Sequence, residues 1–424
     1  FFFKQKTAYE ISTRDWSSDV CSSDLDHKDP LRTFRDEFLL PVGTIYLDGN
    51  SLGALSRSSS KAVESVLHQQ WGQDLIVSWN KADWIHLGQR CARLLEPLIG
   101  AEANSVGVGD SISVNLFKVA SAALALNPNR SIIISEAENF PSDLYVLDGV
   151  ARTSGKEFKA LPKSEILSAL NTDVALLELS HIDYRSAEIW EMKEITARAH
   201  EFGIPVIWDL AHSAGIYPVQ LAECDADFAI GCTYKYLNGG PGAPGFWYIA
   251  PRHQQSMLNP IQGWFGHKKA FAFSPEYVPA DGPDRFYTGT PSVLGLSSLH
   301  ASLELFAKVD MANVREKSIS LIDFTQELAE KHLLSRGFSI FTETNAAKRG
   351  SHISFTHPQG YAIVQALIKR KIIGDFRRPD VLRFGFAPFY NSHQDGLTLV
   401  KSIVDIIDSK EYESPEFQTE SEVI

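Results

Sequence analysis

Two short apolar segments near the middle of the chain constrain the fold more than any other feature. Residues 204–208 (IPVIW) lead directly into Asp209, and residues 228–230 (FAI) are soon followed by Tyr234 and Lys235. Short apolar runs with β-branched and aromatic side chains are typical of buried strands in a parallel sheet, where ligands bind beyond the carboxyl ends. We therefore expect an acid, Asp209, and an amine, Lys235, at one edge of a sheet.

A lysine and a carboxylate at one edge are the two groups that pyridoxal phosphate requires from a protein. The amine of Lys235 can form a Schiff base, and the carboxylate of Asp209 can keep a proton on the pyridine nitrogen. Aromatic and apolar neighbours of Lys235 would lower its pKa by desolvation. A solvated lysine and a helix-capping aspartate are the ordinary alternatives. His212 is expected either near the cofactor ring or as a buried structural histidine.

Composition narrows the class of ligand and the cellular setting. The chain has 424 residues, which is longer than the chain length that usually folds around a single hydrophobic core. We therefore expect two domains. A net charge of -12 argues against nucleic acid and membrane surfaces and favours a small-molecule substrate. No apolar run is long enough to span a bilayer. The four cysteines are Cys21, Cys91, Cys224 and Cys232. They are too few and too irregularly spaced for a disulfide framework or a metal site, which favours a cytoplasmic protein with no bound metal.

The order of apolar runs predicts an α/β fold. Helical patterns such as residues 187–202 separate five expected strands, so the central sheet should be mostly parallel with helices on both faces. These strands are expected at 132–134, 174–179, 204–208, 228–230 and 246–249. The later part of the chain has α+β character. It is expected to contain helices at 314–334, 361–370 and 395–407, and strands at 353–355 and 381–386.

The order of the expected strands and helices also suggests the domain organisation. Residues 1–25 resemble translated sequencing adaptor rather than a signal peptide, and are excluded from the fold. Residues 26–70 are expected to pack with the small domain, and residues 71–300 to form the large cofactor-binding domain. Residues 301–408 would form the small domain, and the acidic residues 409–424 a disordered tail.

Other candidate residues surround the expected cofactor. Ile112 and Ser113 lie at the start of an apolar helix, where backbone N–H groups can bind a phosphate, although ordinary capping gives the same pattern. Phe140 could stack on the ring and Asp143 could bond its phenolic oxygen, with a core phenylalanine and a turn as the alternative. Arg383 lies in an apolar strand, where its planar guanidinium suits either a substrate carboxylate or a structural salt bridge.

Six segments in order make the sequence similar to the kynureninase family, pyridoxal phosphate enzymes of fold type I. The similarity spans nearly everything after Asp26. The segments are Asp48–Gly53 (DGNSLG), Phe140–Asp143 (FPSD), Asp209–His212 (DLAH), Tyr234–Asn238 (YKYLN), Gly263–His267 (GWFGH) and Ala387–Ser392 (APFYNS).

The resemblance implies hydrolysis of L-kynurenine to anthranilate and L-alanine by a homodimer with its site at the interface. Lys235 would carry the cofactor, and Asp209 would contact the pyridine nitrogen. Tyr234 would bind phosphate and move protons, and its cationic neighbour Lys235 could lower the pKa of its phenol. Arg383 and Ser51 would bind the substrate. The remaining cofactor contacts implied by the family are Ile112, Ser113, Phe140, Asp143, Ser180 and His212, with Trp264 and Thr290 reaching the site from the partner subunit.

Two departures and two alternatives accompany this resemblance. The loop 183–187 has Ala187 where the family usually has glycine after a hydroxyl residue, and Thr290 replaces the asparagine of animal members that prefer 3-hydroxykynurenine. Plain kynurenine is therefore the expected substrate. A cysteine desulfurase would need a nucleophilic cysteine near the small domain, but none follows Cys232. A catalytically silent cofactor-binding regulator is the second alternative.

Overall fold

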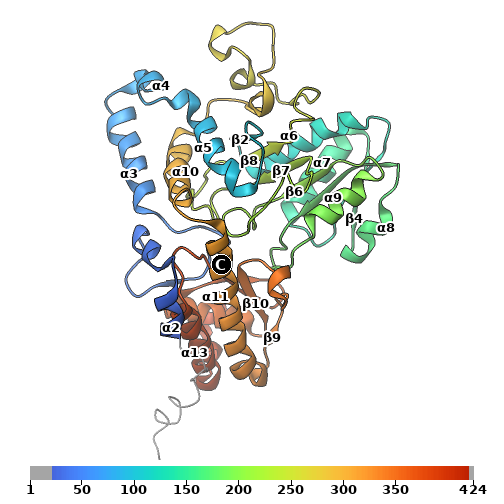
Figure 1. The fold of residues 1–424 in the computed structure, drawn as a ribbon. Coiled ribbons are helices and arrows are strands. Elements are labelled where there is room, and N and C mark those ends of the chain that lie inside the picture. Colours follow the sequence, from blue (N-terminus) through green and yellow to red (C-terminus); the bar gives the residue numbers. More distant parts are fainter. Residues whose placement is uncertain (1–21, 420–424) are drawn as a thin grey trace, which may run out of the picture.

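A computed structural model describes residues 22–419. Figure 1 shows a larger upper part that contains the central sheet and a smaller lower part built around a second sheet. The segment around residues 262–281 projects from the upper part, and the blue N-terminal helix lies beside the red C-terminal helix in the lower part.

The central sheet has seven strands in the order β2-β8-β7-β6-β5-β3-β4. The pairs from β4 through β3, β5 and β6 to β7 are parallel, whereas β8 runs antiparallel to both β7 and β2. The strands are β2 (Val106–Val108), β3 (Ile132–Glu136), β4 (Glu157–Leu161), β5 (Val174–Ser180), β6 (Val206–Asp209), β7 (Phe228–Gly231) and β8 (Phe246–Ile249). The mostly parallel α/β sheet and all five expected strands are confirmed.

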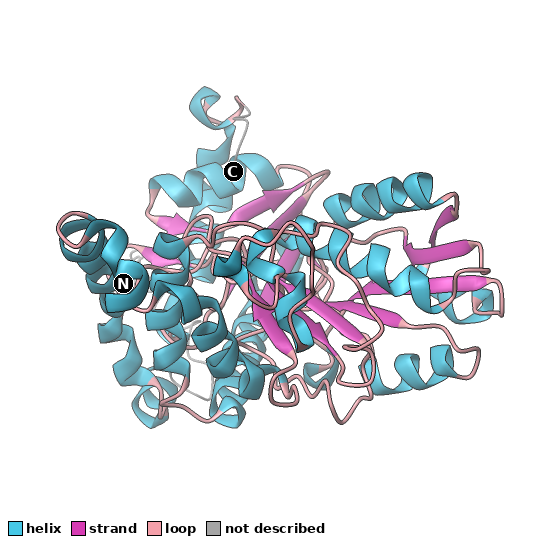
Figure 2. Ribbon diagram, turned by 90° about the horizontal axis from the view of Figure 1, so that it is seen from above, coloured by secondary structure: helices cyan, strands magenta, loops and turns pink. Residues whose placement is uncertain are grey.

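Helices cover both faces of this sheet, as the view from above shows (Figure 2). Alternate residues of a strand point to opposite faces, so Trp208 and Ile207 enter different cores. Trp208 packs on the side of α5 (Leu87–Leu95), α9 (Met192–His200) and α10 (Val293–Phe306). Ile207 packs on the side of α6 (Ile112–Ala123) and α7 (Pro141–Ser154).

The smaller sheet is antiparallel, in the order β12-β13-β10-β9. It packs through one apolar face against three helices, in a core that includes Phe355, Leu382 and Phe384. Its strands are β9 (Ser339–Ile340), β10 (His352–Thr356), β12 (Asp375–Arg377) and β13 (Val381–Gly385), and its helices are α11 (Met311–His332), α12 (Gly360–Lys369) and α13 (His393–Ser409).

The beginning of the described chain joins the small sheet. Helix α2 (Ser22–Lys28) contacts α13 through a hydrogen bond from Ser22 to Gln394, 3.0 Å long. Strand β1 (Ile45–Tyr46) pairs in parallel with β11 (Ile372–Ile373). Helices α3 (Arg57–Ser65), η2 (Val66–Trp71), α4 (Ser78–Lys81) and the short η elements between them then lead into α5. Most of the expected leader, residues 1–21, lies outside the described residues.

Two expectations about helices and order differ from the structure. The helix expected at 187–202 begins only at Met192, because Ala187 adopts a left-handed φ of 63° and Ile189 forms an antiparallel bridge with Ile182. The tail expected to be disordered contains short helices at Glu411–Glu413 and Pro415–Phe417. Phe417 is buried in the small core, and this contact orders the described part of the tail.

Candidate active site

The central site is built from the carboxyl ends of β5, β6 and β7. Ser180 and Asp209 are register partners at the ends of β5 and β6, and Lys235 follows β7 by four residues. The ends of adjacent parallel strands lie at one edge of a sheet. The structure therefore brings the predicted acid and amine together.

Lys235 lies between a histidine and an aromatic ring. Its Nζ is 3.0 Å from Nε2 of His212 and 5.7 Å from the centre of the Phe140 ring. Burial and the charge of Lys235 lower the pKa of His212 well below its usual value, so the imidazole is neutral and can accept a hydrogen bond. His212 and Phe140 thus lie beside the amine, and their contact with a cofactor ring stays a prediction.

Asp209 is buried at the rim. Its Oδ1 accepts a hydrogen bond of 2.7 Å from the Ala211 amide, and its Oδ2 lies 3.5 Å from Ser180 Oγ. Burial raises the pKa of Asp209, and the nearby Lys235 ammonium opposes this rise. A carboxylate in this environment gains stability from a cation placed against it, and a protonated pyridine nitrogen is such a cation.

Two further acids lie behind Asp209, and one was missed by the sequence analysis. Burial and the charge of Asp209 raise the pKa of Asp143 well above its usual value. Glu178, in the middle of β5, has a pKa raised to about 8 by burial. Its Oε2 accepts from Ser135 at 2.8 Å and from Asn139 at 2.8 Å. The signal for Glu178 was a single acid inside an otherwise apolar strand.

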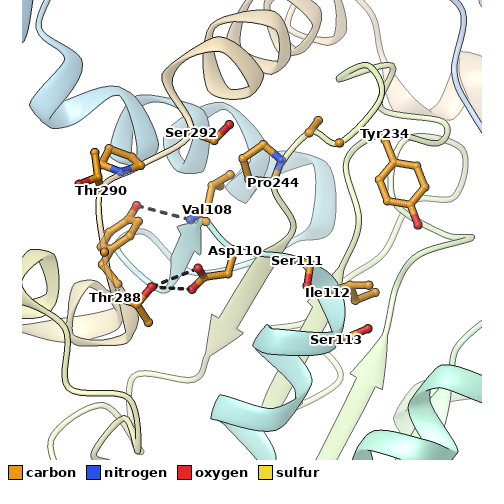
Figure 3. A pocket seen from close by; sticks show the side chains of 16 residues that line it. Val108, Asp110, Ser111, Ile112, Ser113, Tyr234, Pro244, Thr288, Thr290 and Ser292 are labelled. Atoms are coloured by element: carbon orange, nitrogen blue, oxygen red, sulfur yellow. Dashed lines mark hydrogen bonds between the residues drawn. The ribbon is translucent and has the colours of Figure 1, made fainter.

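The N-terminus of α6 opens onto a cavity near the rim. Ser111 caps this helix, and Figure 3 shows Ile112, Ser113 and Tyr234 on one side of the cavity and Thr290 on the other. The cavity has a volume of about 390 Å³. A helix N-terminus offers unpaired N–H groups and a positive dipole end to an anion. These residues could therefore hold a phosphate.

Backbone packing leaves no room for larger residues beside this helix start. A side chain on Gly245 would lie 3.1 Å from the Ile112 amide nitrogen. Asp110 anchors the loop before the helix, since it accepts from Lys118 at 2.7 Å and from Thr288 at 3.1 Å. The amide cradle is thus held rigidly from two sides.

Tyr234 differs from one expectation. The neighbouring Cys232 and burial raise the pKa of the Tyr234 phenol, whereas the sequence analysis expected a cationic neighbour to lower it. The prediction of a lowered pKa was wrong, because Cys232 and burial both act to raise it. Tyr234 is a protonated hydrogen-bond donor at neutral pH.

The small sheet supplies the other end of the site. Arg383 Nε donates to Asp375 Oδ1 at 2.8 Å, and its Nη2 donates to Ser51 Oγ at 3.0 Å. The structural salt bridge that the sequence left open is therefore present. Asp375 and Arg377, which also pairs with Asp375, were missed because their strand is only three residues long.

Trp264 is a predicted site residue that does not line the cavity at the start of α6. Its ring packs in an aromatic cluster with Trp79, Phe265 and Phe271, at centroid distances of 6.5, 5.2 and 5.4 Å. Thr290, in contrast, lines the same cavity as Ser113. The expectation that Trp264 and Thr290 serve the partner's site stays a prediction.

Comparisons with known proteins agree on one family. Residues 314–403 match the model of the kynureninase C-terminal domain. Kynureninase from Pseudomonas fluorescens is 43% identical over 406 residues, which cover 94% of this chain and 98% of the relative. Kynureninase from Burkholderia mallei is 41% identical with the same coverage. The chain belongs to the kynureninase family.

The fold of this kynureninase family member is similar to that of several solved structures. A cysteine desulfurase from Thermococcus onnurineus matches with a TM-score of 0.74 and 18% identity, covering 93% of this chain and all of that chain. The cystine C-S lyase C-DES, solved with cysteine persulfide, matches with a TM-score of 0.76 and 19% identity, covering 86% and 98%. These similarities confirm the fold class.

The free cysteines of this kynureninase family member do not suit desulfurase chemistry. Cys91 and Cys232 are buried, and burial raises the pKa of both thiols, which disfavours a nucleophilic thiolate. Within residues 22–419, no group of histidine, cysteine or acidic side chains is arranged to hold a metal ion. No helix in the described part of the chain is long and apolar enough to cross a membrane.

Proposed function

We propose that this protein is a pyridoxal phosphate-dependent kynureninase that hydrolyses L-kynurenine to anthranilate and L-alanine. The observation that carries the proposal is the convergence of Lys235, Asp209 and the Ser113 helix start in a chain of this family. The substrate, the products and the residue roles below are parts of the proposal.

The residues at the rim fit the cofactor. Asp143 Oδ2 and His212 Nδ1 are buried polar atoms without hydrogen-bond partners among the described residues, so they favour a polar ligand. Asp209 would pair with the pyridine nitrogen, Phe140 and His212 would lie against the ring, and Ser180 would orient Asp209. Ile112, Ser113 and Tyr234 would bind the phosphate. When bound, pyridoxal phosphate supplies an electron sink for charge that develops at the substrate's Cα and Cβ.

The protein's own side chains would then bind the substrate and move its protons. Lys235 would take the proton from Cα and return one at the end of the reaction, since its amine would lie beside the cofactor ring. Tyr234, which is protonated, would donate a hydrogen bond to developing negative charge. Ser51 and Arg383 would hold the α-carboxylate and so fix Cα over the lysine.

We propose a homodimer in which Trp264 and Thr290 reach the partner's site. The support is a group of exposed apolar side chains near the aromatic cluster, because contiguous exposed apolar surface marks interaction sites. The side chain of Phe273 is 75% exposed and that of Ile76 is 76% exposed. A cytoplasmic location is supported by the free thiols of Cys91, Cys224 and Cys232.

The decisive test is the release of fluorescent anthranilate from L-kynurenine by the purified, cofactor-loaded protein. We expect a yellow protein with steady anthranilate production, and a lower rate on 3-hydroxykynurenine. A yellow protein that releases no anthranilate would favour the silent regulator and would contradict the proposal. Release of sulfide from cysteine would instead favour the desulfurase.

A further inference from the structure

One face of the small sheet carries a row of charged and polar residues. In antiparallel pairs, directly opposite residues point to the same face. Arg383 lies opposite Ser354 on β10 and opposite Asp375 on β12. Arg377 is two residues beyond Asp375 and therefore shares this polar face. The neighbouring positions, including Phe376, fill the core on the other face.

Arg383 has few hydrogen-bond donors left for a ligand. A guanidinium has five N–H groups. Arg383 uses Nε and one Nη2 proton for Asp375, the second Nη2 proton for Ser51, and one Nη1 proton for the Tyr184 carbonyl. Its side chain is only 2% exposed. The single remaining N–H cannot bind a second carboxylate in the two-pronged geometry that arginine favours.

Arg377 has the donors that Arg383 lacks. Its Nη2 donates to Asp375 at 2.7 Å and to Ser51 at 3.3 Å, while its Nε is buried without a partner in the described part of the chain. A buried N–H without a partner is costly, so it favours an incoming acceptor. The side chain is 35% exposed, which leaves it reachable by a small ligand.

Arg377 also lies within electrostatic reach of the reacting groups. Its charge contributes to the lowered pKa of His212, whose Nε2 is 3.0 Å from Lys235 Nζ. A substrate whose amine replaces that of Lys235 at the cofactor would carry its α-carboxylate close to the position of the lysine nitrogen. The polar face of the small sheet, with Arg377 and Arg383, is the cationic surface that this carboxylate would meet.

The charges around the two arginines leave room for one more anion. Asp375 balances one guanidinium. Burial and Asp375 raise the pKa of the second acid, Asp48, to about 7, so a large share of it is protonated at neutral pH. Four further titratable groups at the cluster are neutral, since burial lowers the pKa of His352 to about 3 and raises the pKa values of the phenols of Tyr46, Tyr236 and Tyr390.

We propose that Arg377 is a second substrate-binding residue, whose unpaired Nε edge contacts the α-carboxylate beside the remaining N–H of Arg383. Asp375 holds the two guanidiniums together and is therefore a positioning residue, while Ser51 contacts both arginines beside the substrate. The proposal rests on the proposed function, because it takes the substrate to be an α-amino acid whose amine replaces that of Lys235 at the cofactor.

The test measures ligand binding to the cofactor-loaded enzyme by the change in cofactor absorbance. Two ligands are compared: L-alanine, the product amino acid, and the amine formed by removing the α-carboxylate from L-kynurenine. For Arg377→Met we expect L-alanine to bind roughly 10- to 100-fold more weakly, because charge-assisted hydrogen bonds are lost. The affinity for the amine without a carboxylate should stay unchanged.

A conservative variant and a control keep the test sharp. Arg377→Lys retains the charge and should recover part of the L-alanine affinity, which also answers the question if Arg377→Met fails to load the cofactor. Arg336→Lys, at a surface ion pair with Asp408 in the same domain, should bind both ligands normally.

Two outcomes would overturn the assignment of Arg377. One is unchanged L-alanine affinity in both Arg377 variants, and the other is an equal loss of affinity for both ligands. Failure of the proposed function gives a different result, since the unaltered enzyme would then bind amino acids but release no anthranilate.

Discussion

The two ends of the site are assembled in different ways. At the rim of the large sheet, each functional residue lies at or just after the carboxyl end of its own parallel strand, as Ser180, Asp209 and Lys235 do. On the small sheet, the functional residues lie within strands, on one face, and depend on antiparallel register, as Asp375 and Arg383 do. Strand ends can be located from sequence, whereas register requires the folded structure.

This difference suggests separate roles for the two ends. The rim holds the amine and acid that the reaction itself needs, and the small sheet holds the charges that recognise an amino acid. Changes at the rim should therefore lower turnover, and changes on the small sheet should mainly raise the KM.

The largest expected effect is at the rim. Lys235→Ala removes the amine beside His212 and Phe140 and should lower kcat by at least roughly 10³-fold. Anthranilate fluorescence measures the rate, and Lys61→Ala on the exposed surface of α3 is the control. A Lys235→Ala enzyme with a rate near normal would remove the central residue of the proposed mechanism.

A smaller effect is expected on the small sheet. Arg383→Lys keeps the charge but loses the two-pronged contact with Asp375, so the KM for kynurenine should rise about 10-fold while kcat changes little. Steady-state kinetics separate the two constants, with Arg152→Lys as a surface control. A fall in kcat without a change in KM would contradict the division between the two ends.

The third prediction uses pH to sharpen the comparison. As the pH rises through about 7, Asp48 loses its proton and its new negative charge opposes the substrate carboxylate. The KM should therefore rise over this range, by several-fold up to about 10-fold. In Asp48→Asn this rise should disappear, while other pH effects on kcat remain. An identical KM profile in both enzymes would show that Asp48 does not influence binding.

The smallest effect concerns the loop that carries Tyr184 toward Arg383. Ala187 has a φ of 63°, where a Cβ costs about 1–2 kcal/mol. Ala187→Gly should raise the free energy of unfolding by about 0.5–1 kcal/mol, because greater freedom of the unfolded glycine offsets part of the relief. Thermal unfolding measures this change. Ala197→Gly, on the exposed side of α9, should instead lower stability by about 1 kcal/mol. A destabilised Ala187→Gly protein would contradict the strain argument.

Much of the site at the rim of the large sheet could be predicted from the sequence. Apolar runs located every strand from β3 to β8 except β4, whose exposed and half-buried residues hide the pattern. Asp209 and Lys235 could be paired because parallel strands bring their carboxyl ends together. Glu178 was not recognised, since a lone acid in a strand gives no hint of its partners Ser135 and Asn139.

The small sheet was harder to predict for a physical reason. Strand β12 has only three residues, and its polar residues Asp375 and Arg377 resemble a loop in sequence. Their importance follows from Asp375 lying opposite Arg383. That register is fixed by packing of Phe376 and Leu382 in the small core, which involves residues distant in sequence.

The hydrogen bond between Ser51 and Arg383 joins residues 332 positions apart. A growing polypeptide that has passed Lys235 already contains the lysine, the acid and the helix start for the phosphate, but it still lacks every cationic group for recognising an amino acid. A truncated polypeptide that ends before Asp375 would therefore retain the residues that bind the vitamin B6 cofactor but would lack the residues that recognise the substrate's carboxylate.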